Sequence, residues 1–164
     1  SFENSDFYKL QLSKLGNKKS KIKYNNKILH QSKLINYFSG NTSKEKIEKD
    51  LDKMFKKIKK NKKYYFSTKD NILIESLISD GIKVSEKYES MLELNKSNIP
   101  TDIEVMINDG EIAMILLRLV EIIGEDNLKD LGTETLYFIV STLNKLNIDK
   151  IRNDIILHVI PVKV

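Results

Sequence analysis

The residues best suited to chemistry form a run of lysines that ends in aromatic side chains. The run contains Lys56, Lys57, Lys59, Lys60, Lys62 and Lys63, and Tyr64 and Tyr65 follow it directly. Ammonium groups at this density displace the counterions of a nucleic acid, and an aromatic ring can stack on an unpaired base. Arginine, which recognises guanine with two hydrogen bonds, is missing from the run, so the pattern predicts binding without base specificity.

Two other interpretations of the lysine run stay open. In the one we favour, the lysines cover a solvated helix face while the aromatic residues pack into the core. In the other, the basic helix over residues 46–60 meets an anionic membrane or an acidic protein. The apolar face of this helix has only five residues, and Asp50 and Asp52 interrupt its charge. We therefore expect it to pack against a neighbouring helix rather than on a membrane.

Groups able to carry catalysis or to hold a metal are scarce in the sequence. The chain has no cysteine, which excludes disulfides, thiolate catalysis and Cys-based metal sites. Its two histidines, His30 and His158, belong to no metal-ligand spacing, and we expect His158 to be structural. The sequence has no glycine-rich phosphate loop, nucleophile elbow or Ser–His–Asp pattern. We therefore expect a protein that is not an enzyme and that uses no cofactor and no metal.

Arg118 interrupts the most apolar stretch of the sequence, residues 112–123. This stretch is too short to cross a bilayer, which needs about 20 residues, so we expect no transmembrane segment and a buried core helix here. A buried arginine must be paired or must extend its charged end to solvent. Because Glu121 follows one helical turn later, we expect a structural ion pair between Arg118 and Glu121. A polar contact at a groove or a subunit interface is the alternative.

The charges divide the chain into two parts of opposite sign. Residues 1–70 hold 19 basic and 7 acidic side chains, whereas residues 71–164 hold 9 and 16, and the whole chain has a net charge of +5. This division predicts a helical body with a basic flank that serves as an interaction surface. The two parts can also meet between copies, head to tail, so a homo-oligomer is a further hypothesis. The sequence begins at Ser1, and the cytoplasm and the periplasm both remain open.

Apolar spacing predicts an all-α fold of roughly seven to nine helices. Two prolines and six glycines give few breaks in 164 residues, which favours long helices. The helices are expected at residues 5–15 and 29–38, from Thr42 to near Asn61, at residues 67–80 and 84–94, from Thr101 to the turn at Asp109 and Gly110, and at residues 111–123, 133–146 and 149–160. Thr42 with Glu45 and Thr101 with Glu104 fit capping boxes, and Ser67 with Asp70 opens another helix. We divide the chain into a basic, less regular segment, residues 1–41, and a helical-hairpin domain, residues 42–164.

Two turns in this pattern resemble each other. Leu77 and Gly81 match Leu143 and Asn147 at an offset of 66 residues, and glycine and asparagine are the residues that best adopt a left-handed helix end. The offset is twice 33, and helix-pair repeats have a period of about 33–34 residues. The match indicates stacked helix pairs, although a plain bundle explains it as well.

The C-terminal residues resemble a family of helical repeats. The resemblance covers about residues 70–160 and rests on Gly110, Glu111, Ile112, Ala113, Leu116, Leu117, Leu119, Val120, Ile123, Gly124, Leu136, Leu143, Leu146 and Ile148. This pattern is similar to the C-terminal end of uncharacterised alphaproteobacterial α-solenoid proteins, which are built from stacked helix pairs of the tetratricopeptide type. The tetratricopeptide signature itself is absent, since the chain has no tryptophan. The resemblance implies a solenoid C-terminus and a protein-binding role.

Together these patterns predict stacked helical hairpins, with a closed helical bundle as the alternative. The expected function is a non-enzymatic protein-interaction or scaffold module, a fragment or the C-terminal part of a longer helical-repeat protein, because stacked helix pairs expose a concave face to partners. Nucleic-acid binding through the lysine-rich residues 44–66 and structural self-association are the two other hypotheses.

Overall fold

The computed structural model describes residues 33–60, 66–92, 99–125 and 127–160, and these residues form an all-α fold, as predicted. No strand occurs among them. A helix occupies residues 33–38, and the further elements are α3 (Lys44–Lys60), α4 (Thr68–Ser79), the 3₁₀ helix η2 (Glu86–Met91), α5 (Thr101–Asn108), α6 (Ile112–Ile123), α7 (Thr133–Lys145) and α8 (Asp149–Val159). The helix predicted at residues 5–15 lies outside the described residues.

The predicted apolar stripe of α3 is confirmed. Its members are all buried: Ile47, Leu51, Met54, Phe55 and Ile58. They join one continuous core with α4, α7 and α8, because each of these helices turns an apolar face inward. Leu34 and Phe38 belong to the same core. The packed unit therefore includes residues 33–38, ahead of the boundary expected at residue 42.

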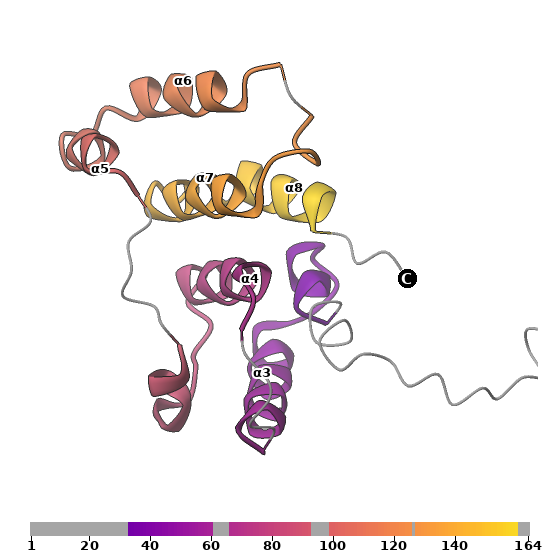
Figure 1. The fold of residues 1–164 in the computed structure, drawn as a ribbon. Coiled ribbons are helices and arrows are strands. Elements are labelled where there is room, and N and C mark those ends of the chain that lie inside the picture. The colour runs from indigo at the N-terminus through magenta and orange to yellow at the C-terminus, as the bar shows by residue number, and fades with distance from the viewer. Residues whose placement is uncertain (1–32, 61–65, 93–98, 126, 161–164) are drawn as a thin grey trace, which may run out of the picture.

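Helices α4 and α7 lie side by side and run in the same direction. The hydroxyl of Thr68 donates to Glu134 at their N-terminal ends, over 3.2 Å. At their C-terminal ends the hydroxyl of Ser79 donates to the carbonyl of Asn144, over 3.4 Å. Helices α5 and α6 form a hairpin on the other side of α7 (Figure 1). A stack in strict chain order would instead place this hairpin between α4 and α7, so the helices pack in an order different from their order along the chain.

The two similar turns end α4 and α7 in the same way. Gly81 and Asn147 have φ angles of +80° and +55°, so both adopt the predicted left-handed conformation. The next residue closes each turn: the N–H of Ile82 donates to the carbonyl of Leu77, and that of Ile148 to Leu143, over 3.0 and 3.1 Å. These bonds satisfy carbonyls that a helix end otherwise leaves unpaired.

The predicted helix starts are correct in one case and wrong in two. Ser67 and Asp70 form a capping box at the start of α4. The capping box expected at Thr42 does not form, because Ser43 takes this place and accepts from the N–H of Lys46 over 3.4 Å. The one expected at Thr101 also fails, because Pro100 in an extended conformation precedes the helix and Thr101 is already helical.

Two further predictions about helices are wrong. The long helix predicted at residues 84–94 does not form in its described part, residues 84–92: the structure has the short η2 there, and Tyr88 is the only fully buried side chain of η2. A single buried residue gives too little packing to stabilise three turns of α-helix, and a short 3₁₀ helix forms instead. Helix α6 is not a buried core helix, since only Ile115 and Leu119 are buried along it.

Candidate functional site

The lysines of α3 form a basic stripe on the surface. Lys56, Lys57, Lys59 and Lys60 are exposed, and none of these four ammonium groups pairs with a carboxylate in the described part of the chain. Lys62, Lys63, Tyr64 and Tyr65 lie outside the described residues. At 3.6 residues per turn the stripe extends along one side of α3, and its members are Lys46, Lys49, Lys53, Lys56, Lys57 and Lys60.

The opposite face of α3 is fixed to the body of the protein. The ring of Phe55 stacks on Tyr88 with 5.3 Å between ring centroids, and it contacts Phe66 at 5.8 Å. The apolar face of α3 is therefore occupied by the core, as expected, and only the lysine side faces outward. Within the described residues, no helix is long and apolar enough to cross a membrane.

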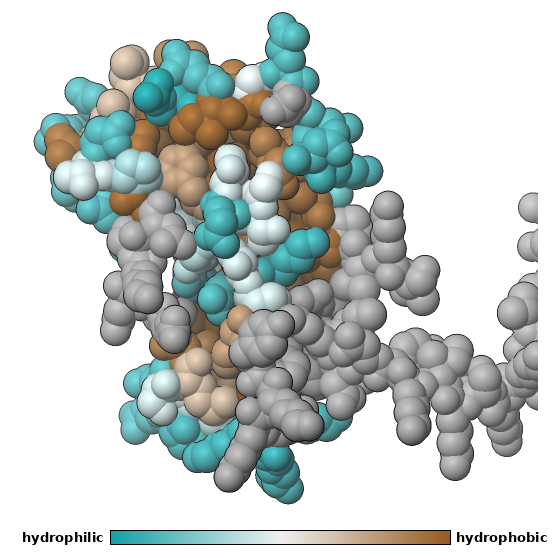
Figure 2. Space-filling view, in the orientation of Figure 1, coloured by the Kyte–Doolittle hydropathy of each residue, from teal (hydrophilic) through white to brown (hydrophobic). Residues whose placement is uncertain are grey.

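Helix α6 presents a second, apolar surface. Its exposed apolar side chains, here called the α6 face, are Ile112, Met114, Leu117, Val120 and Ile122. Leu117 is 59% exposed and Val120 63%, although α6 contains no acidic or basic residue except Arg118 and Glu121. Hydrophobic surface gathers over this part of the molecule in Figure 2. Contiguous exposed apolar side chains on a folded protein mark a binding surface or an aggregation liability.

The ion pair predicted between Arg118 and Glu121 is present, with 3.0 Å between Nη1 and Oε2. The pair lies at the surface, because both side chains are more than half exposed and the helix that carries them is not buried as expected. Since α6 contacts the body along one narrow edge, Arg118 points to solvent and needs no buried partner. An exposed pair of this kind contributes about 0–1 kcal/mol to stability.

The buried arginine of this fold is Arg152 on α8, which the sequence analysis did not single out. Its side chain has 0% exposure and its guanidinium lies 2.7 Å from Asp80 and 3.0 Å from Asp149. It also donates to the side-chain oxygen of Asn144 over 3.1 Å and to that of Asn153. A signal existed: Arg152 precedes the buried Ile155 and Ile156 by three and four residues, which places it on the inner face of α8.

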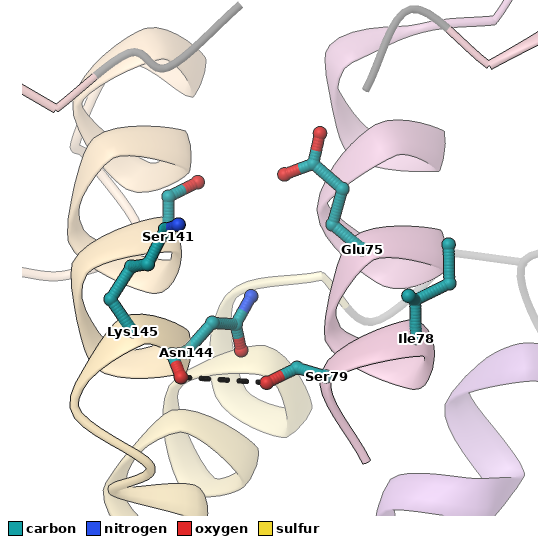
Figure 3. Close-up of a pocket in the computed structure, with 6 residues that line it drawn as sticks. All are labelled: Glu75, Ile78, Ser79, Ser141, Asn144 and Lys145. Atoms are coloured by element: carbon teal, nitrogen blue, oxygen red, sulfur yellow. Dashed lines mark hydrogen bonds between the residues drawn. The ribbon is translucent and has the colours of Figure 1, made fainter. Parts of the chain in front are cut away.

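A polar cleft of about 300 Å³ lies between α4 and α7 (Figure 3). Its lining residues recur every three or four positions on each helix, and they are Glu75, Ile78, Ser79, Ser141, Asn144 and Lys145. Glu75 points from α4 toward α7, and Ser141 points from α7 toward α4. The small serine side chains leave the space that larger residues would fill.

Glu75 is the one carboxylate among the residues that line this cleft, and its pKa is shifted. The hydroxyl of Tyr137 donates to one of its carboxylate oxygens. Burial raises the pKa of Glu75 above its usual value of 4.5, and the hydrogen bond from Tyr137 opposes this shift only in part. Burial and the neighbouring Glu75 in turn raise the pKa of Tyr137, which stays protonated at neutral pH. The second oxygen of Glu75 is left available to a ligand.

Metal-binding geometry is absent from the described residues, where no three His, Asp or Glu side chains gather to hold an ion. His158 is exposed, and its Nδ1 lies 2.7 Å from the carbonyl oxygen of Asp154 in the same helix. This contact fits the structural role expected for His158.

Comparisons with protein-family models, with curated proteins and with solved structures found no match to this chain. The described residues offer three candidate binding surfaces: the basic stripe, the α6 face and the polar cleft.

Proposed function

We propose that this protein is a protein-interaction module and that the α6 face is its docking surface. The observation that carries the proposal is the exposure of five large apolar side chains on one helix, with Val120 at 63%. Leaving such groups in water forgoes about 25 cal/mol for each Å² of apolar surface that a partner would cover. Three of these side chains, Met114, Leu117 and Val120, recur every three residues on one side of α6, a spacing that helix-in-groove recognition uses.

The charges around the α6 face indicate the chemistry of the partner. The hairpin over residues 101–125 carries six acidic side chains and a single basic one, Arg118. The acidic residues are Asp102, Glu104, Asp109, Glu111, Glu121 and Glu125. An apolar surface with a negative rim favours an apolar segment flanked by lysine or arginine, because complementary charges steer association and exclude acidic competitors.

The test compares a double variant of the face with a matched control. Leu117→Asp with Val120→Asp places two charges on the α6 face, whereas Ile151→Asp alters an isoleucine of α8 that is 46% exposed. Proteins cross-linked to the full-length wild type in its native source should be lost with the double variant and retained with the control. Partners captured equally by all three proteins would overturn the proposal, and sedimentation at several concentrations separates a foreign partner from a second copy.

The basic stripe of α3 supports a second candidate function, the binding of single-stranded nucleic acid. Its six lysines are exposed along one side of the helix and recur in each of its turns. A positive groove or stripe without arginine suits a phosphate backbone rather than particular bases. Binding that does not weaken with salt, or no binding to unstructured probes, would exclude this candidate.

A further inference from the structure

We propose that the polar cleft between α4 and α7 binds a small zwitterion, a free amino acid, with its ammonium group on Glu75 and its carboxylate on Lys145. This inference is independent of the proposed docking surface, because the cleft lies on the other side of α7 from the α5–α6 hairpin.

The cleft is lined by one acidic and one basic side chain that do not form an ion pair with each other. Glu75 and Lys145 both line it, yet they form no ion pair with one another. Glu75 has a single hydrogen bond, from Tyr137, so its other carboxylate oxygen can accept from a ligand ammonium group. Lys145 is exposed and makes no ion pair. A molecule with an ammonium group and a carboxylate on one carbon carries the charge complementary to each of these side chains.

Uncharged residues of the cleft offer further contacts to the proposed ligand. Ser141 lies one turn before Lys145 on α7, so its hydroxyl can share the ligand carboxylate with the lysine. Ile78 supplies an apolar contact from α4. A volume of about 300 Å³ lies at the lower end of the range for small-molecule sites, which favours an amino acid with a small side chain over a nucleotide or a peptide.

The walls of the cleft are held in place before any ligand arrives. The amide of Asn144 donates to the hydroxyl of Ser76 over 3.3 Å, and Arg152 donates to the same Asn144. Arg152 also pairs with Asp80 at the end of α4, so the C-terminal ends of α4 and α7 are tied through one buried guanidinium. Preorganised walls reduce the entropy that a ligand must lose on binding.

The experiment titrates the full chain with glycine and L-alanine and follows the backbone amides by NMR. We expect saturable shifts confined to residues 75–79 and 141–145. Methylamine and acetate, each half of the zwitterion, should bind at least roughly tenfold more weakly, since a charged hydrogen bond is worth about that factor. Glu75→Gln and Lys145→Gln should each weaken binding by a similar factor.

Three controls separate this site from general effects. Glu125→Gln and Lys150→Gln remove one exposed charge each outside the cleft, and both should leave binding unchanged. Ser141→Leu fills the cleft without removing a charge and should abolish binding. Glu75→Gln keeps an acceptor for Tyr137, so the variant is expected to fold. The proposal is overturned by an absence of saturable shifts, by equal binding of methylamine or acetate, or by an equal loss of binding in Glu125→Gln or Lys150→Gln.

Discussion

The guanidinium of Arg152 lies 2.7 Å from the carboxylate of Asp80 and thereby joins α8 to the end of α4. The side chain of Arg152 is fully buried, and that of Asp80 is 12% exposed. The ring of Phe38 lies 5.9 Å from the guanidinium carbon, so residues 33–38 meet the same pair. Three segments that are far apart in the sequence therefore converge on one arginine.

Replacing this arginine should strongly destabilise the fold. Arg152→Met leaves the carboxylate of Asp80 without its cationic partner, and the expected loss is about 3–5 kcal/mol in the free energy of unfolding. The double variant Arg152→Met with Asp80→Asn should recover part of this loss. Arg118→Met is the matched control, because its ion pair is exposed and worth about 0–1 kcal/mol. Equal losses for the two arginines in urea unfolding would contradict the assignment.

The contrast between the two arginines shows what local sequence leaves undetermined. Both interrupt an apolar helical pattern, and each has an acidic residue three positions away, Glu121 for Arg118 and Asp149 for Arg152. What separates them is Asp80, 72 residues from Arg152, which no local pattern connects to it. The burial of α6 was mispredicted for a related reason: an apolar run shows that a helix can be buried, not which neighbours cover it.

Features that depend on residues close together in the sequence were predictable. The buried stripe of α3 follows from its apolar spacing, and the ends of α4 and α7 follow from Gly81 and Asn147. The cleft at Glu75 was not predictable, because it exists only where α4 and α7 lie side by side. The 66-residue offset between the two turns was the one signal that related these helices, and the hydrogen bond from Thr68 to Glu134 spans the same interval.

Glu75 should make the stability of the protein depend on pH. Burial raises its folded-state pKa above 4.5, so the folded state holds this proton more tightly than the unfolded state does. The associated stability is present below pH 4.5 and is lost as the pH rises through the folded-state pKa. Glu75→Gln should therefore be more stable than the wild type at neutral pH. The charged or titratable groups beside it are Tyr137 and Lys145, both on α7.

Urea unfolding of both proteins at neutral pH and near pH 4.5 checks this prediction. The advantage of the variant should shrink at the lower pH, where Glu75 is protonated in the unfolded state as well. A difference between the two proteins that is independent of pH would show that Glu75 contributes through packing alone.

Alanine should destabilise the protein at both left-handed residues that end α4 and α7, Gly81 and Asn147. A Cβ built at Gly81 meets only the Nζ atom of Lys44, at 4.0 Å, so the cost of Gly81→Ala is conformational rather than steric crowding. That cost is about 1–2 kcal/mol for a left-handed residue other than glycine. Asn147→Ala should be destabilising as well, whereas Asn147→Gly should retain the wild-type stability. Thermal unfolding of the three variants checks this, and a tolerated alanine at both turns would contradict it.

The basic stripe predicts a specific dependence on salt. If four lysines neutralise phosphates, the affinity for single-stranded DNA should fall by about two orders of magnitude when the salt concentration rises fourfold. Changing Lys56, Lys57 and Lys60 to Glu should remove most of this dependence. Fluorescence anisotropy with an unstructured oligonucleotide measures both effects, and Lys129→Glu, which lies outside α3, is the control.

The α6 face gives a prediction that separates a binding surface from a part of the core. Leu117 is 59% exposed, whereas Leu119 is buried two residues later on the same helix. Leu117→Asp should change the free energy of unfolding by no more than about 0.5 kcal/mol, the usual range for surface substitutions. Leu119→Asp should be strongly destabilising, because it buries an unpaired charge in the core. If Leu117→Asp destabilises the isolated chain as much as Leu119→Asp does, then α6 is covered in solution by the chain itself or by a second copy. An effect limited to Leu119→Asp leaves the α6 face open in the free protein, as a docking surface requires.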